Sequence, residues 1–277
     1  MEVVWITLGI LVIGMLIYGA LLNSFPKTEY YEIFTDKINA DVKLVFLTDL
    51  HGCVHGKENE TLIHMIEKEE PDFICIAGDM TVKNGKGIKE TVSLLKTLRG
   101  KYPIFYAPGN HEIRMEEYDS YKKMLQEIQV SYLENAGKTE KGIRIIGLDL
   151  DEYWYHKCWQ KRDFTEEHLT ELLGKNESEQ YSILIAHNPE YFPQYAKWGA
   201  DVTLSGHVHG GIARLPILGG VIAPSLRLFP KYDAGKFEKN GNYMILSRGL
   251  GLHHIKLRFF NRPEVSVINL TCQFDKK

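Results

Sequence analysis

Polar residues of the kinds that bind metal ions follow five apolar segments of the 277-residue sequence. The apolar segments are rich in β-branched and aromatic residues, as buried strands are. The polar residues that follow them are Asp49, His51, Asp79, Asn110, His111, His187, His207 and His209. Carboxylate, amide and imidazole groups without thiolates favour borderline divalent ions such as manganese, iron or zinc. The set therefore indicates a metal site if the fold brings its members together.

Each fragment of this set has an ordinary structural explanation when it is taken alone. Asp49 suits a helix N-cap, and Asp79 follows a glycine as in many turns. His187 is harder to explain in this way, because an ionisable residue that closes a fully apolar segment needs a polar partner. His207 and His209 are two residues apart, so an extended chain would place both side chains on one face.

An alternation of strands and helices supplies the frame that would position these residues. Strands are predicted at 30–34, 43–47, 72–77, 102–107, 143–148, 181–186, 200–205, 242–247 and 263–270, and helices at 56–70, 87–98, 118–129 and 165–173. This pattern predicts an α/β domain, with the C-terminal strands forming a second sheet packed on the first. Ligands bind at the carboxyl ends of strands in such sheets, so we expect the polar residues to surround one point.

The ordered motifs D-x-H, G-D, G-N-H-E, H and G-H-x-H, between about Val42 and Ile212, resemble those of the calcineurin-like metallophosphoesterase superfamily. The resemblance implies two mixed β-sheets sandwiched between helices and two divalent metal ions, with manganese expected and iron or zinc as alternatives. The N-terminal apolar segment, the motif GHVHGG and the tail RFFNRPEVSVINL are similar to the membrane-anchored branch that includes UDP-2,3-diacylglucosamine hydrolases.

The resemblance also implies a role for each residue. Asp79 would bridge two metals, and each metal would have three further ligands: Asp49, His51 and His209 for one, and Asn110, His187 and His207 for the other. His111 would not bind metal but would act as the catalytic general acid on the leaving oxygen. Arg114, Arg227 and Arg248 are candidate substrate-binding residues for a non-reacting phosphate, although solvated arginines are the ordinary alternative.

Two positions depart from the family pattern. Many members continue G-D-x-x-D, whereas Val82 stands here in place of the second acid. Because that acid is not a metal ligand, its absence questions how the nearby histidine is oriented. Ile212 follows H-G-G where related sequences often have glutamine, which bears on the substrate rim.

The segment from Val3 to Leu22 contains no charged residue. As a helix it would span roughly 30 Å, the thickness of the hydrocarbon core of a bilayer. No basic residue precedes it and no clear A-x-A site follows it, so we expect a single transmembrane anchor rather than a cleaved signal peptide. Lys27, Lys37 and Lys43 follow the segment and weakly favour a cytosolic catalytic domain.

Composition places few other constraints on function. Hydrophobic residues make up 44% and charged residues 25% of the chain, and the formal net charge is −3. These values are typical of a globular protein, and no basic tract favours nucleic-acid binding. The four cysteines, Cys53, Cys75, Cys158 and Cys272, are far apart and are expected to be free thiols.

The expected organisation is a transmembrane anchor at 1–22, a linker with the first strand at 23–41, and a metallophosphoesterase catalytic domain at 42–277. The expected function is two-metal hydrolysis of a phosphodiester or pyrophosphate bond in a lipid-linked or membrane-proximal substrate. A phosphomonoesterase, a cyclic-nucleotide phosphodiesterase and a non-catalytic membrane-tethered scaffold remain alternatives, because fold alone does not establish function.

Overall fold

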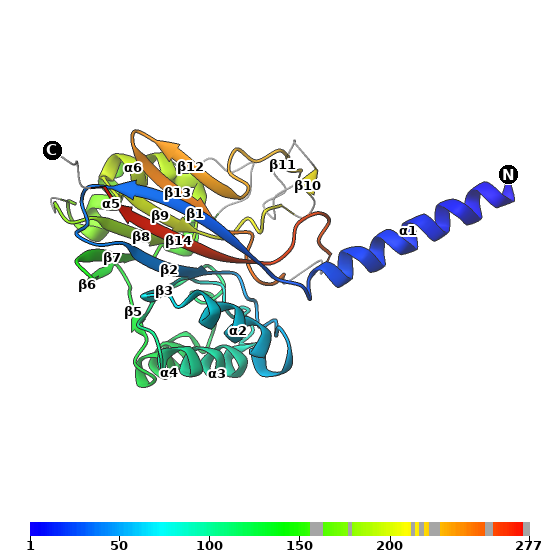
Figure 1. Ribbon diagram of the computed structural model, residues 1–277, viewed down its shortest axis with the longest axis horizontal. Coiled ribbons are helices and arrows are strands. Elements are labelled where there is room, and N and C mark those ends of the chain that lie inside the picture. Colours follow the sequence, from blue (N-terminus) through cyan, green and yellow to red (C-terminus); the bar gives the residue numbers. More distant parts are fainter. Residues whose placement is uncertain are drawn as a thin grey trace.

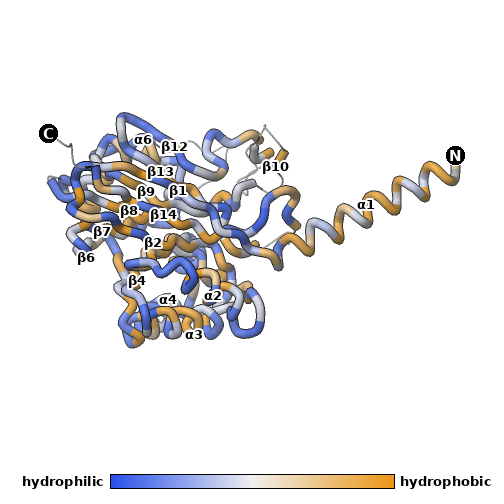
Figure 2. Tube along the Cα trace, viewed as in Figure 1, coloured by the Kyte–Doolittle hydropathy of each residue, from blue (hydrophilic) through white to orange (hydrophobic). Residues whose placement is uncertain are grey.

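The computed structural model describes residues 1–155, 163–176, 179–211, 214–215, 219–221, 228–252 and 257–273. Helix α1 (Glu2–Leu22) projects from one end of the folded part of the chain (Figure 1). Figure 2 shows that apolar residues occupy most of its length. Its segment Val3–Leu22 has a mean hydropathy of 2.3 and is long and apolar enough to span a membrane.

The first sheet has the strand order β1-β14-β2-β3-β4-β5. Its strands are β1 (Lys27–Thr35), β2 (Val42–Leu47), β3 (Phe73–Ala77), β4 (Ile104–Ala107), β5 (Ser131–Tyr132) and β14 (Glu264–Cys272). Strands β2 to β5 are parallel, whereas β14 pairs antiparallel with β2 and parallel with β1. Every residue of β3 and β4 is buried, which explains their unbroken apolar sequences.

The second sheet has the strand order β12-β13-β9-β8-β7-β6. Its strands are β6 (Ala136–Glu140), β7 (Ile143–Leu148), β8 (Ser182–Ala186), β9 (Val202–Ser205), β12 (Gly235–Lys239) and β13 (Asn242–Leu246). The four central strands are parallel, and the two edge strands are antiparallel to their neighbours. A separate hairpin joins β10 (Arg214–Leu215) to β11 (Gly219–Gly220).

The two sheets pack face to face, and helices cover their outer faces. Alternate residues of the strands point into different layers: Phe46 and Ile183 belong to the core between the sheets, while Val45 and Leu184 face the helices. The helices are α2 (Glu60–Glu69), α3 (Ile88–Arg99) and α4 (Tyr118–Glu127) on the first sheet, and α5 (Glu166–Leu173) and α6 (Phe192–Trp198) on the second. Short 3-10 turns cover Lys57–Asn59, Glu152–Trp154 and Pro189–Tyr191.

The predicted sandwich of two mixed sheets between helices is confirmed, and so are the free thiols at the described positions Cys53, Cys75 and Cys272. Cys158 lies outside the described residues. Strand β6 was not predicted, because its residues are mostly exposed and its sequence AGKTE has no apolar alternation. This strand forms because it pairs with the buried strand β7, a contact that its own sequence does not specify.

Candidate metal centre

The eight residues singled out in the sequence lie just beyond the carboxyl ends of β2, β3, β4, β8 and β9. The first three strands are parallel neighbours in one sheet and the last two in the other, so their ends converge at one edge of the sandwich. Seven of the eight are buried, and His207 is half-buried. The fold therefore brings the whole set together out of bulk water.

One group of potential ligands consists of Asp49, His51 and His209. Asp49 Oδ1 lies 3.7 Å from the Nε2 atoms of both His51 and His209. Those two ring nitrogens are themselves 3.3 Å apart. Three ligand atoms this close together match what a small divalent cation requires.

A second group consists of Asp79, His187 and His207, and Asp79 also groups with His51 and His111. Asp79 Oδ2 lies 3.1 Å from His187 Nε2. The amide oxygen of Asn110 is buried without a hydrogen-bond partner, a costly state that a cation beside it would relieve. The donor set thus fits two adjacent divalent cations, with Asp79 between them.

Hydrogen bonds to the protein orient the potential ligands. The Nδ1 atom of His187 is 2.6 Å from the carbonyl oxygen of Ala77, so Nδ1–H donates there and Nε2 faces the centre. The backbone N–H of His207 donates to both oxygens of Asp49, and that of His111 donates to Asp79 Oδ1 at 2.7 Å. Both carboxylates are therefore fixed by the loops that carry the histidines.

The backbone of these loops is strained. Asp49, His51, Asp79, His207 and His209 all have positive φ, between 49° and 73°. Residues with a Cβ adopt this region at a cost, so their gathering here is typical of a functional site. A Cβ at Gly206 would overlap the Asp49 carboxylate and the Thr48 hydroxyl, so this position must be glycine for the loop to approach the centre.

Burial and charge shift the pKa values within the centre in opposite directions. Burial raises the pKa of Asp49 to about 7. Burial also disfavours the charged form of Asp79, but His187, His111 and His51 hold its pKa well below its usual range. Desolvation would lower the pKa of His187, yet the two aspartates raise it to about 9. Burial and the neighbouring His187 lower the pKa of His207 to about 3.

His111 has the geometry of a proton donor. Its Nδ1 atom accepts the backbone N–H of Lys83 at 3.2 Å, so in the neutral ring the proton is on Nε2. His111 Nε2 lies 4.0 Å from Asp79 Oδ2 and faces the centre. A backbone N–H one residue beyond Val82 thus contacts the histidine, although the sequence lacks the second acid of the family pattern.

Glu112 fixes the backbone of the loops that carry Asp79 and Gly109. It had no predicted role beyond its place in the motif G-N-H-E. It is fully buried, and its carboxylate accepts hydrogen bonds from Asp79 N–H at 2.7 Å, Gly109 N–H at 3.1 Å and Tyr106 O–H at 2.8 Å. Burial and the nearby Asp79 raise its pKa. The signal that could have revealed it is a carboxylate directly after His111.

The candidate substrate-binding arginines differ in their surroundings. Arg114 pairs with Glu152, with Nε 2.7 Å from Oε1, and its side chain is partly exposed. Arg248 Nη1 lies 2.8 Å from Glu29 Oε1 and 3.5 Å from Glu264 Oε2, so two carboxylates already neutralise it. Arg227 and Ile212 lie outside the described residues.

An aromatic ring that the sequence analysis did not single out also lines the centre. The ring centroid of Tyr155 is 6.0 Å from that of His187 and 5.4 Å from that of His207. It therefore covers one side of the second ligand group.

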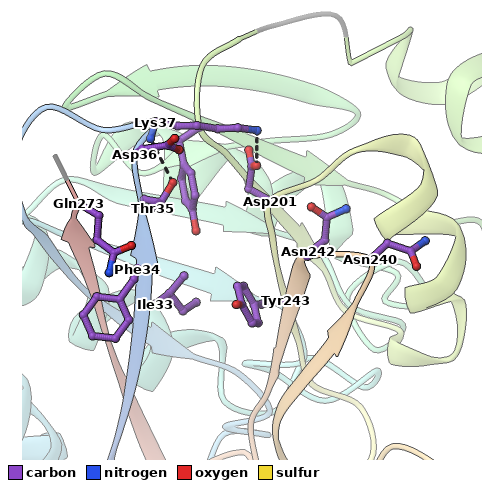
Figure 3. Close-up of a pocket in the computed structure, with 12 residues that line it drawn as sticks. Ile33, Phe34, Thr35, Asp36, Lys37, Asp201, Asn240, Asn242, Tyr243 and Gln273 are labelled. Carbon is purple, nitrogen blue, oxygen red and sulfur yellow. Dashed lines mark hydrogen bonds and ion pairs between the residues drawn. The ribbon is translucent and has the colours of Figure 1, made fainter. Parts of the chain in front are cut away.

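A polar cavity of about 420 Å³ lies at the opposite ends of the strands (Figure 3). Thr35, which ends β1, and Asp201 and Asn242, at the amino ends of β9 and β13, contribute to its lining. The Lys37 ammonium is 2.6 Å from Asp201 Oδ1 at one side of it. None of the candidate metal ligands lines this cavity, so it is separate from the metal centre.

The sandwich of two sheets with a cluster of aspartate and histidine at its edge defines a metallohydrolase of the phosphoesterase class. Residues 42–211, more than half of the chain, match the family model described as calcineurin-like phosphoesterase. The chain belongs to this family and is a metal-dependent phosphoesterase. The resemblance inferred from the ordered motifs is thereby confirmed.

Related proteins are similar over nearly the whole chain. An "Uncharacterized metallophosphoesterase" of Helicobacter pylori (strain J99) is 28% identical over 271 residues, which cover 91% of this chain and 69% of that protein. Another, from Aquifex aeolicus, is 28% identical and covers 91% of this chain and 95% of its own length. A Danio rerio protein named "Transmembrane protein with metallophosphoesterase domain" is 24% identical, covering 95% of this chain and 62% of that protein.

Proposed function

We propose that the protein is a membrane-anchored, binuclear phosphoesterase that hydrolyses a phosphodiester or pyrophosphate bond in a lipid-linked or membrane-proximal substrate. The observation that carries the binuclear part is the shared carboxylate: Asp79 lies in one group with His187 and His207 and in another with His51 and His111. A bridging carboxylate between two ligand sets is the arrangement that two-metal phosphoryl transfer needs.

The proposed metal ligands divide into two sets around Asp79. They are Asp49, His51 and His209 on one side, and Asn110, His187 and His207 on the other. When bound, two divalent cations supply Lewis acidity toward the phosphoryl group and lower the pKa of a nucleophilic water. Manganese is proposed, with iron or zinc as alternatives that the same oxygen and imidazole donors accept.

His111 is proposed as the general acid. His111 Nε2 faces the centre, and the imidazolium form can donate its Nε2 proton to the leaving oxygen. The ring then returns to the neutral form, whose Nδ1 accepts the backbone N–H of Lys83. The absence of a side chain at Gly206 allows the loop to approach the reacting group. Arg114 and Arg248 are the proposed contacts to a second, non-reacting phosphate. Arg114 forms an ion pair with one carboxylate, whereas Arg248 forms ion pairs with two.

The proposed organisation is an anchor in α1, a linker with the first strand at 23–41, and a catalytic domain at 42–277. The strand β1 in the second segment extends the first sheet by pairing with β14 from Lys27↔Glu264 to Thr35↔Cys272. The name of the Danio rerio relative and the apolar length of α1 support membrane anchorage. Lys27, Lys37 and Lys43 favour the cytosolic side for the domain. A membrane anchor suits an acylated, phosphate-containing substrate like those of the UDP-2,3-diacylglucosamine hydrolases.

Hydrolysis of a chromogenic phosphodiester with added manganese tests the catalytic proposal. We expect His111→Ala to lower turnover by about 10²–10⁴-fold while manganese content is retained. Asp79→Asn should lower turnover and also lose metal. His64→Ala, on the exposed face of α2, is the matched control and should keep the native rate. Native rates in both site variants would refute the assignment. If the enzyme is active, a panel of lipid pyrophosphates, cyclic nucleotides and monoesters identifies its substrate class.

A further inference from the structure

Five large apolar side chains are exposed on the loops around the base of α1. They are Phe25, Leu215, Leu228, Phe229 and Phe260, with exposed fractions between 45% and 63%, and we call them the apolar rim. In Figure 1 the hairpin β10–β11 and the loop before β14 lie at the end of the domain from which α1 projects. Exposed apolar groups gathered on one face mark an interaction surface more often than scattered ones do.

Backbone hydrogen bonds connect the loops of the apolar rim to one another and to α1. The N–H of Arg258 donates to the carbonyl oxygen of Gly19 in α1 at 3.0 Å. The N–H of Arg214 in β10 donates to the carbonyl oxygen of Phe259 at 3.1 Å. β10 pairs with β11, and the N–H of Phe229 donates to the carbonyl oxygen of Val221, just after β11, at 2.9 Å. These hydrogen bonds fix the segments that carry Leu215, Phe229 and Phe260 to one another and to α1.

The contacts between the apolar rim and α1 determine how deep the rim would lie in a bilayer that α1 spans. The apolar segment Val3–Leu22 has 20 residues, so as a helix it is about as long as the hydrocarbon core is thick. Gly19 lies three residues before the end of this segment, about 4.5 Å inside it. A Cβ at Gly19 would be 2.8 Å from the Phe259 ring, and the rings of Tyr18 and Phe260 are 6.1 Å apart. If α1 crosses a membrane, Phe259 and Phe260 cannot remain in bulk water.

The charged neighbour of this surface lies where lipid headgroups would be. Arg262 is exposed, and its guanidinium donates to the carbonyl oxygens of Phe25 at 2.8 Å and Pro26 at 3.0 Å. These residues follow the apolar segment by three and four positions. Arginine and aromatic side chains at the end of a span are typical of the membrane interface.

Two of the rim phenylalanines have strained backbones. Phe229 has φ 45° and Phe260 has φ 53°, although bulky residues rarely adopt positive φ. Folding alone gives no reason for large exposed side chains at such positions, because a small polar residue or glycine would fit the turn at lower cost. Strained backbone conformations of this kind cluster at functional sites.

The same loop also reaches the metal centre. The side-chain amide of Asn261, which is buried, donates to the carbonyl oxygens of His209 and Gly211, both at 2.7 Å. Asn261 directly follows Phe260. One residue therefore separates the apolar rim from the loop that carries two of the proposed metal ligands.

We propose that the apolar rim lies immersed in the lipid–water interface of the bilayer that α1 spans. This proposal rests on the proposed membrane anchorage. The immersed rim holds the domain at a fixed orientation, with the loop 207–211 close to the headgroups. A substrate with an acyl chain reaches the metal centre without leaving the membrane.

Quenching of tryptophan fluorescence by lipids brominated in their acyl chains tests the immersion. The full chain carries Phe229→Trp or Phe260→Trp in a Trp5→Phe background and is reconstituted in vesicles of phosphatidylcholine with a minor share of phosphatidylglycerol. Because Trp154, Trp159 and Trp198 remain in every variant, each signal is taken as the difference from the Trp5→Phe protein. Phe34→Trp is the matched control, because Phe34 is similarly exposed at 56% but lies on β1 beside the cavity at the other ends of the sheets. The chain that retains Trp5 reports insertion of α1.

We expect brominated lipid to quench the new tryptophans at 229 and 260 about twofold or more beyond the one at position 34. Quenching at positions 229 and 260 no stronger than at position 34, with Trp5 quenched, would show that α1 inserts while the rim stays in water. That result would overturn the proposal. No quenching of Trp5 would refute the membrane anchorage and the rim together. Hydrolysis of a soluble phosphodiester by the same variants reports separately on the catalytic proposal.

Discussion

Glu112 supports the Asp79 loop, so its replacement by glutamine should weaken both the fold and the metal centre. The carboxylate accepts five hydrogen bonds. The donors are the backbone N–H groups of Asp79, Met80, Thr81 and Gly109 and the hydroxyl of Tyr106. In Glu112→Gln one carboxylate oxygen becomes an NH₂ donor, and either orientation of the amide leaves at least two of these donors without an acceptor.

The magnitude follows from the number of donors left unsatisfied. A buried donor without an acceptor costs about 1–3 kcal/mol, so the free energy of unfolding should fall by about 2–6 kcal/mol. The displaced Asp79 loop should also bind manganese more weakly. Tyr106→Phe removes a single donor and should cost about 1 kcal/mol, which makes it the graded control.

Urea unfolding and calorimetric titration with manganese measure the two effects on the same preparations. The expected order of stability is native, then Tyr106→Phe, then Glu112→Gln, with manganese affinity lowest in the last. A Glu112→Gln protein that unfolds at the native urea concentration and binds manganese with native affinity would refute the supporting role of Glu112.

Two further predictions concern the backbone around the centre. Lys83→Pro removes the N–H that His111 Nδ1 accepts, so turnover should fall by about tenfold with manganese binding retained, whereas Lys83→Ala should behave as the native protein in the same phosphodiester assay. Equal rates for the two Lys83 variants would contradict the orienting role. Gly206→Ala introduces a Cβ that overlaps the Asp49 carboxylate, so it should lower manganese affinity at least tenfold in calorimetric titration, whereas Gly100→Ala at the end of α3 should not. Native metal binding by Gly206→Ala would show that the loop can move away from Asp49.

The sequence predicted the elements that are buried on both faces. Strands β3, β4 and β8 have continuous apolar sequences because sheet and helices cover them, and this burial leaves a signal in every residue. The edge strands β6 and β12 are largely exposed or half-buried, so their sequences carry no comparable pattern. Their existence depends on neighbouring strands that the local sequence does not specify.

The residues of the candidate site could be singled out from the sequence because metal-binding chemistry restricts such residues to a few types, here at strand ends. The supporting contacts could not be predicted in the same way. The hydrogen bond to His111 comes from a backbone N–H, which any residue except proline supplies. The ion pair between Arg248 and Glu29 joins residues 219 positions apart and depends on the completed sheet.

The apolar rim could not be predicted from the sequence either. Its residues come from four short segments, and none of these segments is apolar enough alone to indicate an interface. Only the contacts of Phe260 with Tyr18 and of Phe259 with Gly19 place this loop beside the apolar helix.

The central claim is that two metal ions share Asp79. Anomalous diffraction at the manganese edge, from crystals of the protein loaded with manganese, tests it most directly. Two peaks are expected about 3.5–4 Å apart, with the Asp79 carboxylate between them. In Asp79→Asn crystals at least one peak should weaken or vanish. A single peak in the native protein, or two peaks that Asp79 does not bridge, would contradict the claim.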